Sequence, residues 1–255
     1  MLLVLDIGNT NIKIGLFDNG ALRNSWRMTT DTHRTSDEYG IQMESFFRHI
    51  GLSTDVVDGI IMSSVIPSVN YTIEHMCRLF FHGIQPMLVS NAIKTGLSNK
   101  YDHPETLGAD RICNAVAAYK KYGGPCVAID FGTATNFGIV DENGAFLGGL
   151  ICPGIKVSTD TLIENAAMLP KIEYIKPPKV ICTNTYDAIQ AGIIYGYVGQ
   201  VEFIIHCIEK ELGKKPKVIA TGGMSSMIAS ETDAINILNP TLTLEGLSLI
   251  YEMNK

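Results

Sequence analysis

The 255-residue chain has no run of lysine or arginine, and its formal net charge at pH 7 is -6. The lack of a basic stretch argues weakly against binding to nucleic acid or to an anionic membrane surface. Charged residues make up only 18% of the chain and apolar residues 46%, which is enough apolar side chain for a full core. A chain of this length forms one large domain or two domains of ordinary size.

The chain also lacks the patterns of a zinc, secreted or membrane protein. Its six cysteines show no C-x-x-C or similar spacing and several lie among apolar neighbours, so the reducing cytosol is the expected compartment. The N-terminal apolar run ends at Asp6, too early for a signal peptide. No segment approaches the roughly 18 apolar residues that cross a membrane. We therefore expect a soluble cytoplasmic protein that binds neither nucleic acid nor membrane.

Several catalytic and nucleotide-binding motifs are missing as well. The chain has no G-x-x-x-x-G-K-[ST] loop, and no G-x-G-x-x-G follows a predicted strand. It also has no H-E-x-x-H, no G-x-S-x-G and no Cys-His pair. These absences exclude a P-loop enzyme and argue against a Rossmann dinucleotide site, a zinc protease or a serine hydrolase.

What the chain does have is one pattern that occurs twice. The apolar run Leu2–Leu5 leads into Asp6-Ile7-Gly8-Asn9-Thr10, and the apolar run 126–129 leads into Asp130-Phe131-Gly132-Thr133-Ala134-Thr135. A strand covered on both faces is apolar at every position. Each stretch therefore predicts a buried strand that ends in a turn suited to hold charged oxygens, and we expect a nucleotide to bind between the two copies.

The similarity of the halves extends past the two turns, because each predicts a second strand, an Asn-Gly hairpin and a third strand. The residues Asp6, Gly8, Gly20 and Ala21 recur in order and at the same spacing as Asp130, Gly132, Gly144 and Ala145, and Gly15 and Asp18 match Gly138 and Asp141 with a slip of one residue. An internal duplication explains the match, and coincident turn chemistry is the alternative. The Gly-Gly-Pro break at 123–125 divides the chain into domains of residues 1–122 and 123–255.

Helix signals complete the expected order. Thr35 and Glu38 have the spacing of a capping box that begins a helix. One helix is expected to run through Leu162 to Leu169, and Thr185 is expected to cap a long helix that ends before Gly213. This long helix contains Gly192, Gly196 and Gly199. Glycines lower helix propensity, which favours close packing against another backbone, an intrachain helix crossing rather than a subunit contact.

The paired turns predict a phosphate site. Gly8 and Gly132 let the backbone approach a ligand and direct its amides, while Asn9, Thr10, Thr133 and Thr135 add donors. Carboxylates repel phosphate, so Asp6 and Asp130 make sense if they hold a cation or its waters. Lys13 supplies a positive charge. The alternative for each turn is a structural Asx turn, but the duplicated pair together with Thr221-Gly222-Gly223 favours phosphate binding.

The two turns resemble the phosphate motifs of the actin, hexokinase and Hsp70 superfamily, and the chain as a whole resembles type III pantothenate kinase. The match continues, in chain order, through Tyr101 and Pro104, Gly108-Ala109-Asp110-Arg111, Gly148-Gly149, Pro153-Gly154, Ala167–Pro170, Thr185 and Thr221-Gly222-Gly223. It departs from the family at Asn136, Phe137 and Gly138, and at His103, where the family often has asparagine. These departures remove none of the main groups.

The resemblance implies an α/β fold of duplicated ribonuclease H-like (actin/hexokinase-type) domains, each a mixed sheet of three antiparallel strands plus parallel strands flanked by helices. It also implies a homodimer that transfers phosphate from ATP to the hydroxyl of pantothenate, giving 4'-phosphopantothenate for coenzyme A synthesis. The implied ATP contacts are Asp6, Ile7, Gly8, Asn9, Thr10, Asn11, Ile12, Lys13 and Thr133, with Asp6 on the Mg2+ side. Asp130 would ligate K+ or NH4+, and the implied pantothenate contacts are Tyr101, Gly108, Ala109, Asp110, Arg111 and Thr185.

Asp110 would be the general base, and the residues themselves allow that role. It is expected in the first turn of a helix, where the helix dipole keeps a carboxylate ionised, and phosphoryl transfer asks little of a base beyond orienting the hydroxyl. Arg111 beside it suits a substrate carboxylate. The alternative is that Asp110 only stabilises its helix and Arg111 is a surface charge. At the level of function, the alternatives are a kinase for another small hydroxy acid or sugar, and a non-catalytic nucleotide-binding regulatory (transcriptional accessory) protein.

Overall fold

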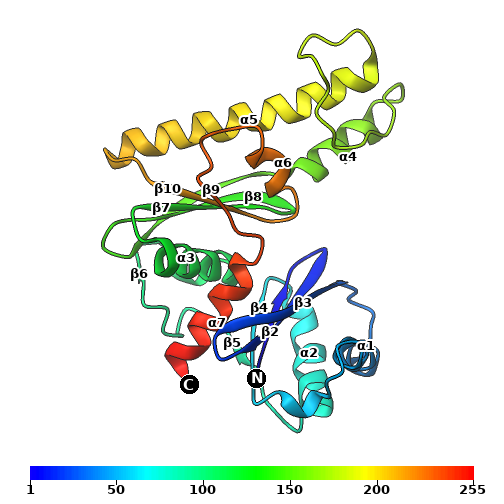
Figure 1. Cartoon of the computed structure of the whole chain (residues 1–255), viewed down its shortest axis with the longest axis vertical. Helices are drawn as coiled ribbons and strands as arrows, with labels where there is room; N and C mark the ends of the chain where they lie inside the picture. Colours follow the sequence, from blue (N-terminus) through cyan, green and yellow to red (C-terminus); the bar gives the residue numbers. More distant parts are fainter. The chain divides into compact units, whose positions relative to one another are not determined.

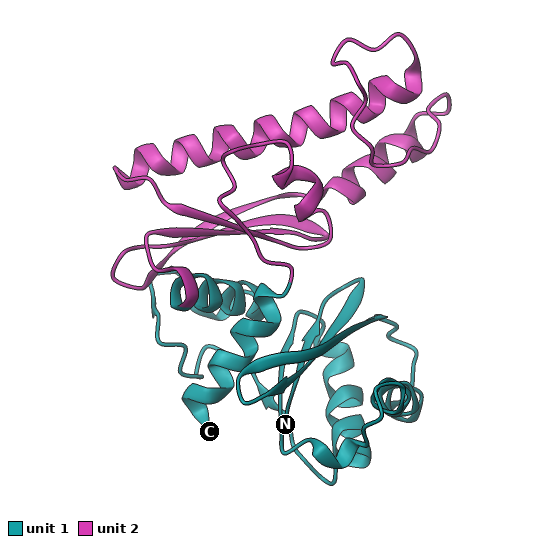
Figure 2. Ribbon diagram, in the orientation of Figure 1, with its two compact units in different colours: residues 1–120, 241–255 teal, residues 121–240 magenta.

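The computed structural model describes all residues from 1 to 255, and the chain divides into two compact units (Figure 2). The first unit comprises residues 1–120 with 241–255, and the second comprises residues 121–240. Each unit is an α/β structure built on its own mixed sheet. The domain boundary between residues 122 and 123, expected from the sequence to lie between the two duplicated segments, stays a prediction.

The sheet of the first unit has the strand order β3-β2-β1-β4-β5. Its strands are β1 (Leu2–Ile7), β2 (Asn11–Asp18), β3 (Ala21–Thr29), β4 (Gly59–Ser64) and β5 (Met87–Leu88). The helices of this unit are α1 (Ser36–His49), α2 (Pro67–Phe80), α3 (Ala109–Tyr122) and α7 (Leu242–Asn254), with the short helices η1 (Thr54–Val56) and η2 (Pro104–Thr106) and the short strand β6 (Ser98–Asn99). α7 packs against β1, β2 and β4, on the side of the sheet opposite α1 and α2 (Figure 1).

Every residue of β1 is buried because helices cover both faces of this strand. Successive side chains of a strand point to opposite faces. Leu3, Leu5 and Ile7 belong to the apolar core that includes α1 and α2. Asp6 therefore points to the opposite face, toward α3 and α7. The alternation thus directs the one charged residue of β1 away from the apolar core that includes α1 and α2.

The strands within the second unit repeat the arrangement, in the order β11-β10-β7-β8-β9. Its elements are β7 (Cys126–Phe131), β8 (Ala134–Val140), β9 (Ala145–Pro153), α4 (Ile155–Asn165), α5 (Thr185–Leu212), β10 (Lys217–Thr221), α6 (Ser225–Ala229) and β11 (Ile237–Leu238). The long helix α5 crosses one face of this sheet (Figure 1). Val198, Val201 and Ile205 of α5 share a core with Val127 and Ile129 of β7.

The two sheets confirm the duplication that the sequence predicts. In each, the first strand pairs antiparallel with the second and parallel with the fourth, and the second pairs antiparallel with the third. The pairing of second and third strands shifts register at Leu16/Phe17 in one unit and at Ile139/Val140 in the other. Gly20 and Gly144 hold the two hairpins, each with φ of 80°. The expected fold class is therefore correct.

Three local expectations are wrong. Asn184, not Thr185, caps α5, because its side chain accepts the backbone N–H of Asp187 and leaves Thr185 as the first helical residue. α4 ends at Asn165, and the segment beyond it turns back through a hydrogen bond from Leu169 N–H to the Ala166 carbonyl. The glycines of α5 do not mark an intrachain crossing, since a Cβ added at Gly192, Gly196 or Gly199 would meet no atom within 4 Å.

A fourth expectation, that no segment resembles a membrane span, is also wrong in a narrow sense. α5 has 28 residues and contains a window with a mean hydropathy of 1.3, so it could cross a membrane by length and composition. One such helix is weak evidence. Part of the apolar surface of α5 belongs to the core of the second unit, and only 33% of the window is buried there.

Candidate functional site

Asp6, at the carboxyl end of β1, is held by both neighbouring strands. The strand register places it opposite Lys13 of β2 and opposite Ser63 of β4. The Ser63 hydroxyl donates a hydrogen bond of 2.7 Å to Asp6 Oδ1, and Lys13 Nζ lies 3.3 Å from Asp6 Oδ2. The carboxylate is buried, at 5% exposure. Each of its oxygens thus has a defined neighbour supplied by the sheet.

The turn after Asp6 is shaped by a second set of contacts. Gly8 N–H donates to the Asn11 carbonyl at 3.1 Å, and a Cβ at Gly8 would lie 3.2 Å from the same oxygen. Thr30 fastens the turn from outside, because its hydroxyl donates to the Gly8 carbonyl at 2.6 Å and its N–H to the Thr10 carbonyl at 3.1 Å. Asn9 is exposed. Among the predicted ATP contacts, Ile7 and Ile12 pair with each other in the sheet and their side chains belong to the apolar core, so neither side chain reaches a nucleotide.

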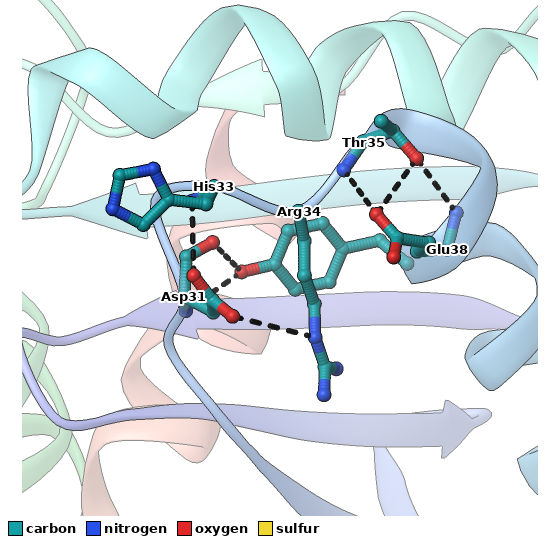
Figure 3. A network of polar contacts seen from close by, with 6 residues as sticks. Asp31, His33, Arg34, Thr35 and Glu38 are labelled. Carbon is teal, nitrogen blue, oxygen red and sulfur yellow. Dashed lines mark hydrogen bonds and ion pairs between the residues drawn. The ribbon is translucent and has the colours of Figure 1, made fainter.

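The loop that carries Thr30 is itself fixed by hydrogen bonds (Figure 3). The buried Tyr39 hydroxyl accepts from Asp31 N–H at 3.0 Å and donates to the Asp31 carbonyl at 2.8 Å. The Asp31 carboxylate accepts from His33 N–H at 2.9 Å. Thr35 and Glu38 form the predicted capping box at the start of α1. The first turn of the site therefore rests on a rigid support.

Asp110 is the second residue of α3, and Gly108 leaves room for its carboxylate. A Cβ at Gly108 would lie 2.5 Å from Asp110 Oδ1, so any side chain there would displace the carboxylate. The Gly108 carbonyl accepts from Arg111 N–H and Ile112 N–H and starts the helix. α7 holds α3 in place, since a Cβ at Gly246 would lie only 2.0 Å from the Cys113 carbonyl oxygen.

The buried thiol of Cys113 shows that Asp6 and Asp110 lie on the same side of the first unit. Burial raises the pKa of this thiol well above its ordinary value; the carboxylates of Asp6 and Asp110 raise this pKa further, and a hydrogen bond with Ser63 opposes the rise. Both carboxylates are therefore within electrostatic reach of one sulfur atom. Asp6 and Asp110 are far apart in the sequence, yet both act on the same buried thiol.

The predicted substrate residues around Asp110 also have defined places. The Arg111 guanidinium lies over the Tyr101 ring, 5.5 Å from its centroid, and the arginine is only 8% exposed. This burial contradicts the alternative in which Arg111 is a surface charge. His103 points to solvent and pairs with Glu105 at 3.4 Å. A planar guanidinium held against an aromatic ring is suited to a carboxylate of a small molecule.

In the second unit, Asp130 ends β7 as Asp6 ends β1. It is buried and lies in register with Thr221 of β10, so both side chains point to the same face of the sheet. The Thr221 hydroxyl is buried and has no hydrogen-bond partner. Gly222, with φ of 95°, lets the next turn pass the carboxylate, because a Cβ there would lie 2.5 Å from Asp130 Oδ1.

The turn that contains Thr133 is braced from the other side by Gly154. Gly154 N–H donates to the Thr133 carbonyl at 3.1 Å, and a Cβ at Gly154 would lie 2.2 Å from that oxygen. Thr185, the remaining predicted substrate residue, begins α5 on an exposed surface of the same unit. The chain has no cluster of three or more His, Cys, Asp or Glu side chains that could hold a metal.

Three residues that shape these sites, Ser63, Thr30 and Gly246, were missed from the sequence. Ser63 could have been suspected from one fact, that it lies near the end of a parallel strand next to β1. The carboxyl ends of adjacent parallel strands meet at one edge of a sheet, where ligands bind in open α/β folds. Thr30 and Gly246 act through contacts with segments distant in the sequence, and no local pattern marks them.

Several solved structures are similar to this chain over nearly its whole length. A Campylobacter jejuni protein described as a Baf family transcriptional activator is 20% identical, with a TM-score of 0.61 over 98% of this chain and 97% of its own. Component A of (R)-2-hydroxyglutaryl-CoA dehydratase from Acidaminococcus fermentans is 14% identical, with a TM-score of 0.58 over 98% and 96%. A Sinorhizobium meliloti protein described as a 2-dehydro-3-deoxygalactonokinase is 10% identical, with a TM-score of 0.61 over 99% and 96%.

At these identities the likeness concerns the fold alone, and that fold, with its two similar mixed sheets, is the one of the actin-like and sugar-kinase class. The sequence narrows this class further. A family model described as type III pantothenate kinase matches residues 2–207. The chain belongs to that family, and it is a nucleotide-binding kinase.

Proposed function

We propose that the protein phosphorylates the hydroxyl of pantothenate with ATP, giving 4'-phosphopantothenate and ADP, the first step toward coenzyme A. The observation that carries this proposal is the place of Asp110. Asp110 lies in the first turn of α3 beside Gly108, its carboxylate acts on the same buried thiol as that of Asp6, and the next residue is the buried Arg111. These places support the roles proposed for Asp110 as base, Asp6 as the carboxylate on the Mg2+ side and Arg111 as the cation that meets the substrate, in a chain that belongs to the type III family.

In the proposed reaction the substrate hydroxyl oxygen attacks the γ-phosphorus, the bond from that phosphorus to the β-γ bridging oxygen breaks, and ADP leaves. Asp110 orients the hydroxyl and accepts its proton as the new bond forms. Lys13 and the turn of Gly8, Asn9 and Thr10 bind phosphate oxygens, with Gly8 shaping the turn through its own N–H bond to the Asn11 carbonyl. Arg111 pairs with the carboxylate of pantothenate. We include Tyr101, Ala109 and Thr185 among the substrate contacts, and Asn11 and Thr133 among the ATP contacts.

Asp6 is suited to bind Mg2+, directly or through a water molecule. Nucleotide sites bind Mg2+ through one or two carboxylates together with phosphates and water, so a cluster of protein ligands is not required. Asp6 offers one carboxylate at the edge of a phosphate-type turn, fixed by Ser63 and Lys13. Bound Mg2+ would neutralise charge on the phosphate oxygens.

The direct test is an assay of purified, folded protein with pantothenate, ATP, Mg2+ and K+. We expect stoichiometric ADP and 4'-phosphopantothenate, identified by mass spectrometry. Folded protein that forms no phosphopantothenate with K+ or NH4+ present would overturn the proposal. ADP formation with a sugar or another hydroxy acid, and none with pantothenate, would identify the related kinase instead. Nucleotide binding without transfer to any acceptor would favour a regulatory protein.

We further propose that the protein is a cytoplasmic homodimer joined through α5. Gly192, Gly196, Gly199 and Phe203 recur at helical spacing and are all exposed, so they form one apolar stripe along this helix. Gly192 and Gly196 of the stripe also line a groove of about 360 Å³ between α4 and α5, together with apolar side chains such as Leu162 and Ile193. A second α5 laid along the stripe would cover this surface, and the glycines would allow the close approach.

Replacing Phe203 with glutamate is expected to break this dimer. Sedimentation equilibrium should give twice the chain mass of 27.8 kDa for the wild type and the single chain mass for Phe203→Glu. Tyr71→Glu is the matched control, because Tyr71 is an aromatic residue on α2 with 71% exposure, compared with 69% for Phe203. A monomeric wild type, or equal dissociation of the two variants, would contradict assembly through the stripe.

A further inference from the structure

We propose that Ser63 is a positioning residue for the phosphate site: its hydroxyl holds the Asp6 carboxylate in the orientation that receives Mg2+-ATP. The inference rests on the proposed role of Asp6 and extends it to a residue on another strand. Ser63 is fully buried and Asp6 is 5% exposed, and their side chains meet at 2.7 Å although 57 positions separate them in the sequence. A buried hydrogen bond to a charged group is strong and geometrically defined.

The two oxygens of Asp6 are divided between two unlike partners. Oδ1 accepts from the neutral Ser63 hydroxyl, and Oδ2 lies 3.3 Å from the Lys13 ammonium. Without the hydroxyl, the attraction of Lys13 is the main force that remains on the carboxylate. Asp6 would then turn both oxygens toward Lys13, which neutralises the charge that Lys13 offers to phosphate and withdraws the carboxylate from the cation.

Ser63 points to the same face of the sheet as Asp6, where its hydroxyl has two neighbours. These are the Asp6 carboxylate at 2.7 Å and the buried Cys113 thiol of α3. The next residue, Ser64, makes a different contact, since its hydroxyl accepts from Ile66 N–H at 3.1 Å and shapes the entry into α2. Adjacent strand residues point to opposite faces, so these two serines form a matched pair.

The experiment measures the affinity for ATP by isothermal titration calorimetry, with and without Mg2+, and without any acceptor. Loss of a residue that orients a metal ligand typically costs about 10-fold or more in affinity. Ser63→Ala is expected to weaken Mg2+-ATP binding about 10-fold and to change the affinity for metal-free ATP less than about twofold. Ser64→Ala is expected to leave both affinities near those of the wild type.

The ratio of the affinity for Mg2+-ATP to that for metal-free ATP distinguishes a misplaced Asp6 carboxylate from a loss of stability. A partly unfolded sample lowers the apparent binding of both ligands together and leaves the ratio unchanged. Ser63→Thr keeps the hydroxyl and is expected to keep the wild-type ratio. An unchanged ratio in Ser63→Ala, or a Ser63→Thr ratio as low as that of Ser63→Ala, would overturn the inference. Since no pantothenate is present, this result is independent of the kinase assay. If the wild type phosphorylates pantothenate but Ser63→Ala keeps the wild-type ratio of the two ATP affinities, only the role of Ser63 is rejected and the proposed function stands.

Discussion

Asp110→Asn is expected to lower kcat by about 10²- to 10⁴-fold, the usual contribution of a positioned acid or base, and to leave the fold intact. Asparagine has the size and shape of aspartate, so it fits the space that Gly108 leaves. Its neutral amide cannot accept the proton of the substrate hydroxyl at neutral pH. The measurement is kcat with saturating ATP and pantothenate, beside the thermal unfolding midpoint.

Asp37→Asn provides a matched control for this variant. Asp37 and Asp110 are each the second residue of a helix of 14 residues, so each carboxylate interacts favourably with a helix N-terminus. The loss of that interaction costs a few tenths of a kcal/mol to about 1 kcal/mol in either helix, so the two variants should show similar decreases in the unfolding midpoint. Only Asp110→Asn should lose turnover. Near-wild-type turnover in this variant would remove Asp110 from the role of base and return it to that of a helix-stabilising residue.

A companion variant, Gly108→Ala, tests the position of the carboxylate without removing it. The added Cβ would lie 2.5 Å from Asp110 Oδ1, so the carboxylate must move. A displacement of about 1 Å in a reacting group can cost about 100-fold in rate. We therefore expect a large loss of kcat in a folded protein, while full activity would show that the place of the carboxylate relative to Gly108 does not matter.

The repeated architecture was predictable because its signals are local. A buried strand is apolar throughout, its end is marked by an aspartate and a glycine, and a hairpin is marked by Asn-Gly; each of these signals occurs twice in the same order. The capping box of Thr35 and Glu38 is equally local, and it is present. Such features depend on neighbours within a few residues, so the sequence contains them directly.

The supports of the site were not predictable because they depend on contacts between distant segments. Nothing near Gly246 in the sequence indicates that its missing side chain admits the backbone of Cys113. The glycines of α5 gave a wrong prediction for a related reason. Glycines in a helix are typical of close packing against another backbone, but no other segment of this chain packs against them. Similarly, Asn184 and Thr185 are both good helix caps, and only the hydrogen bond to Asp187 N–H decides between them.

The second large effect is expected at Asp130, where we propose a site for K+ or NH4+. The buried carboxylate and the buried, unpartnered Thr221 hydroxyl point to the same face of the sheet and offer two oxygen ligands of the kind that hard cations take. Turnover should be at least about 10-fold faster in K+ or NH4+ than in Na+ at equal ionic strength, and Asp130→Asn should abolish this difference.

Two buried threonines provide the sharpest version of this experiment. The hydroxyls of Thr221 and Thr135 are both fully buried without a hydrogen-bond partner, and both residues lie on strands next to β7. Thr135 is in register with Phe131, whose side chain belongs to the core beneath α5, so Thr135 points to the face opposite Asp130. Valine replaces each hydroxyl by a methyl group of similar volume, so Thr221→Val should raise the K+ concentration needed for half-maximal activity and Thr135→Val should not. Equal effects of the two variants, or equal wild-type rates in Na+ and K+, would count against a selective cation site at Asp130 and would leave its carboxylate a structural part of the turn.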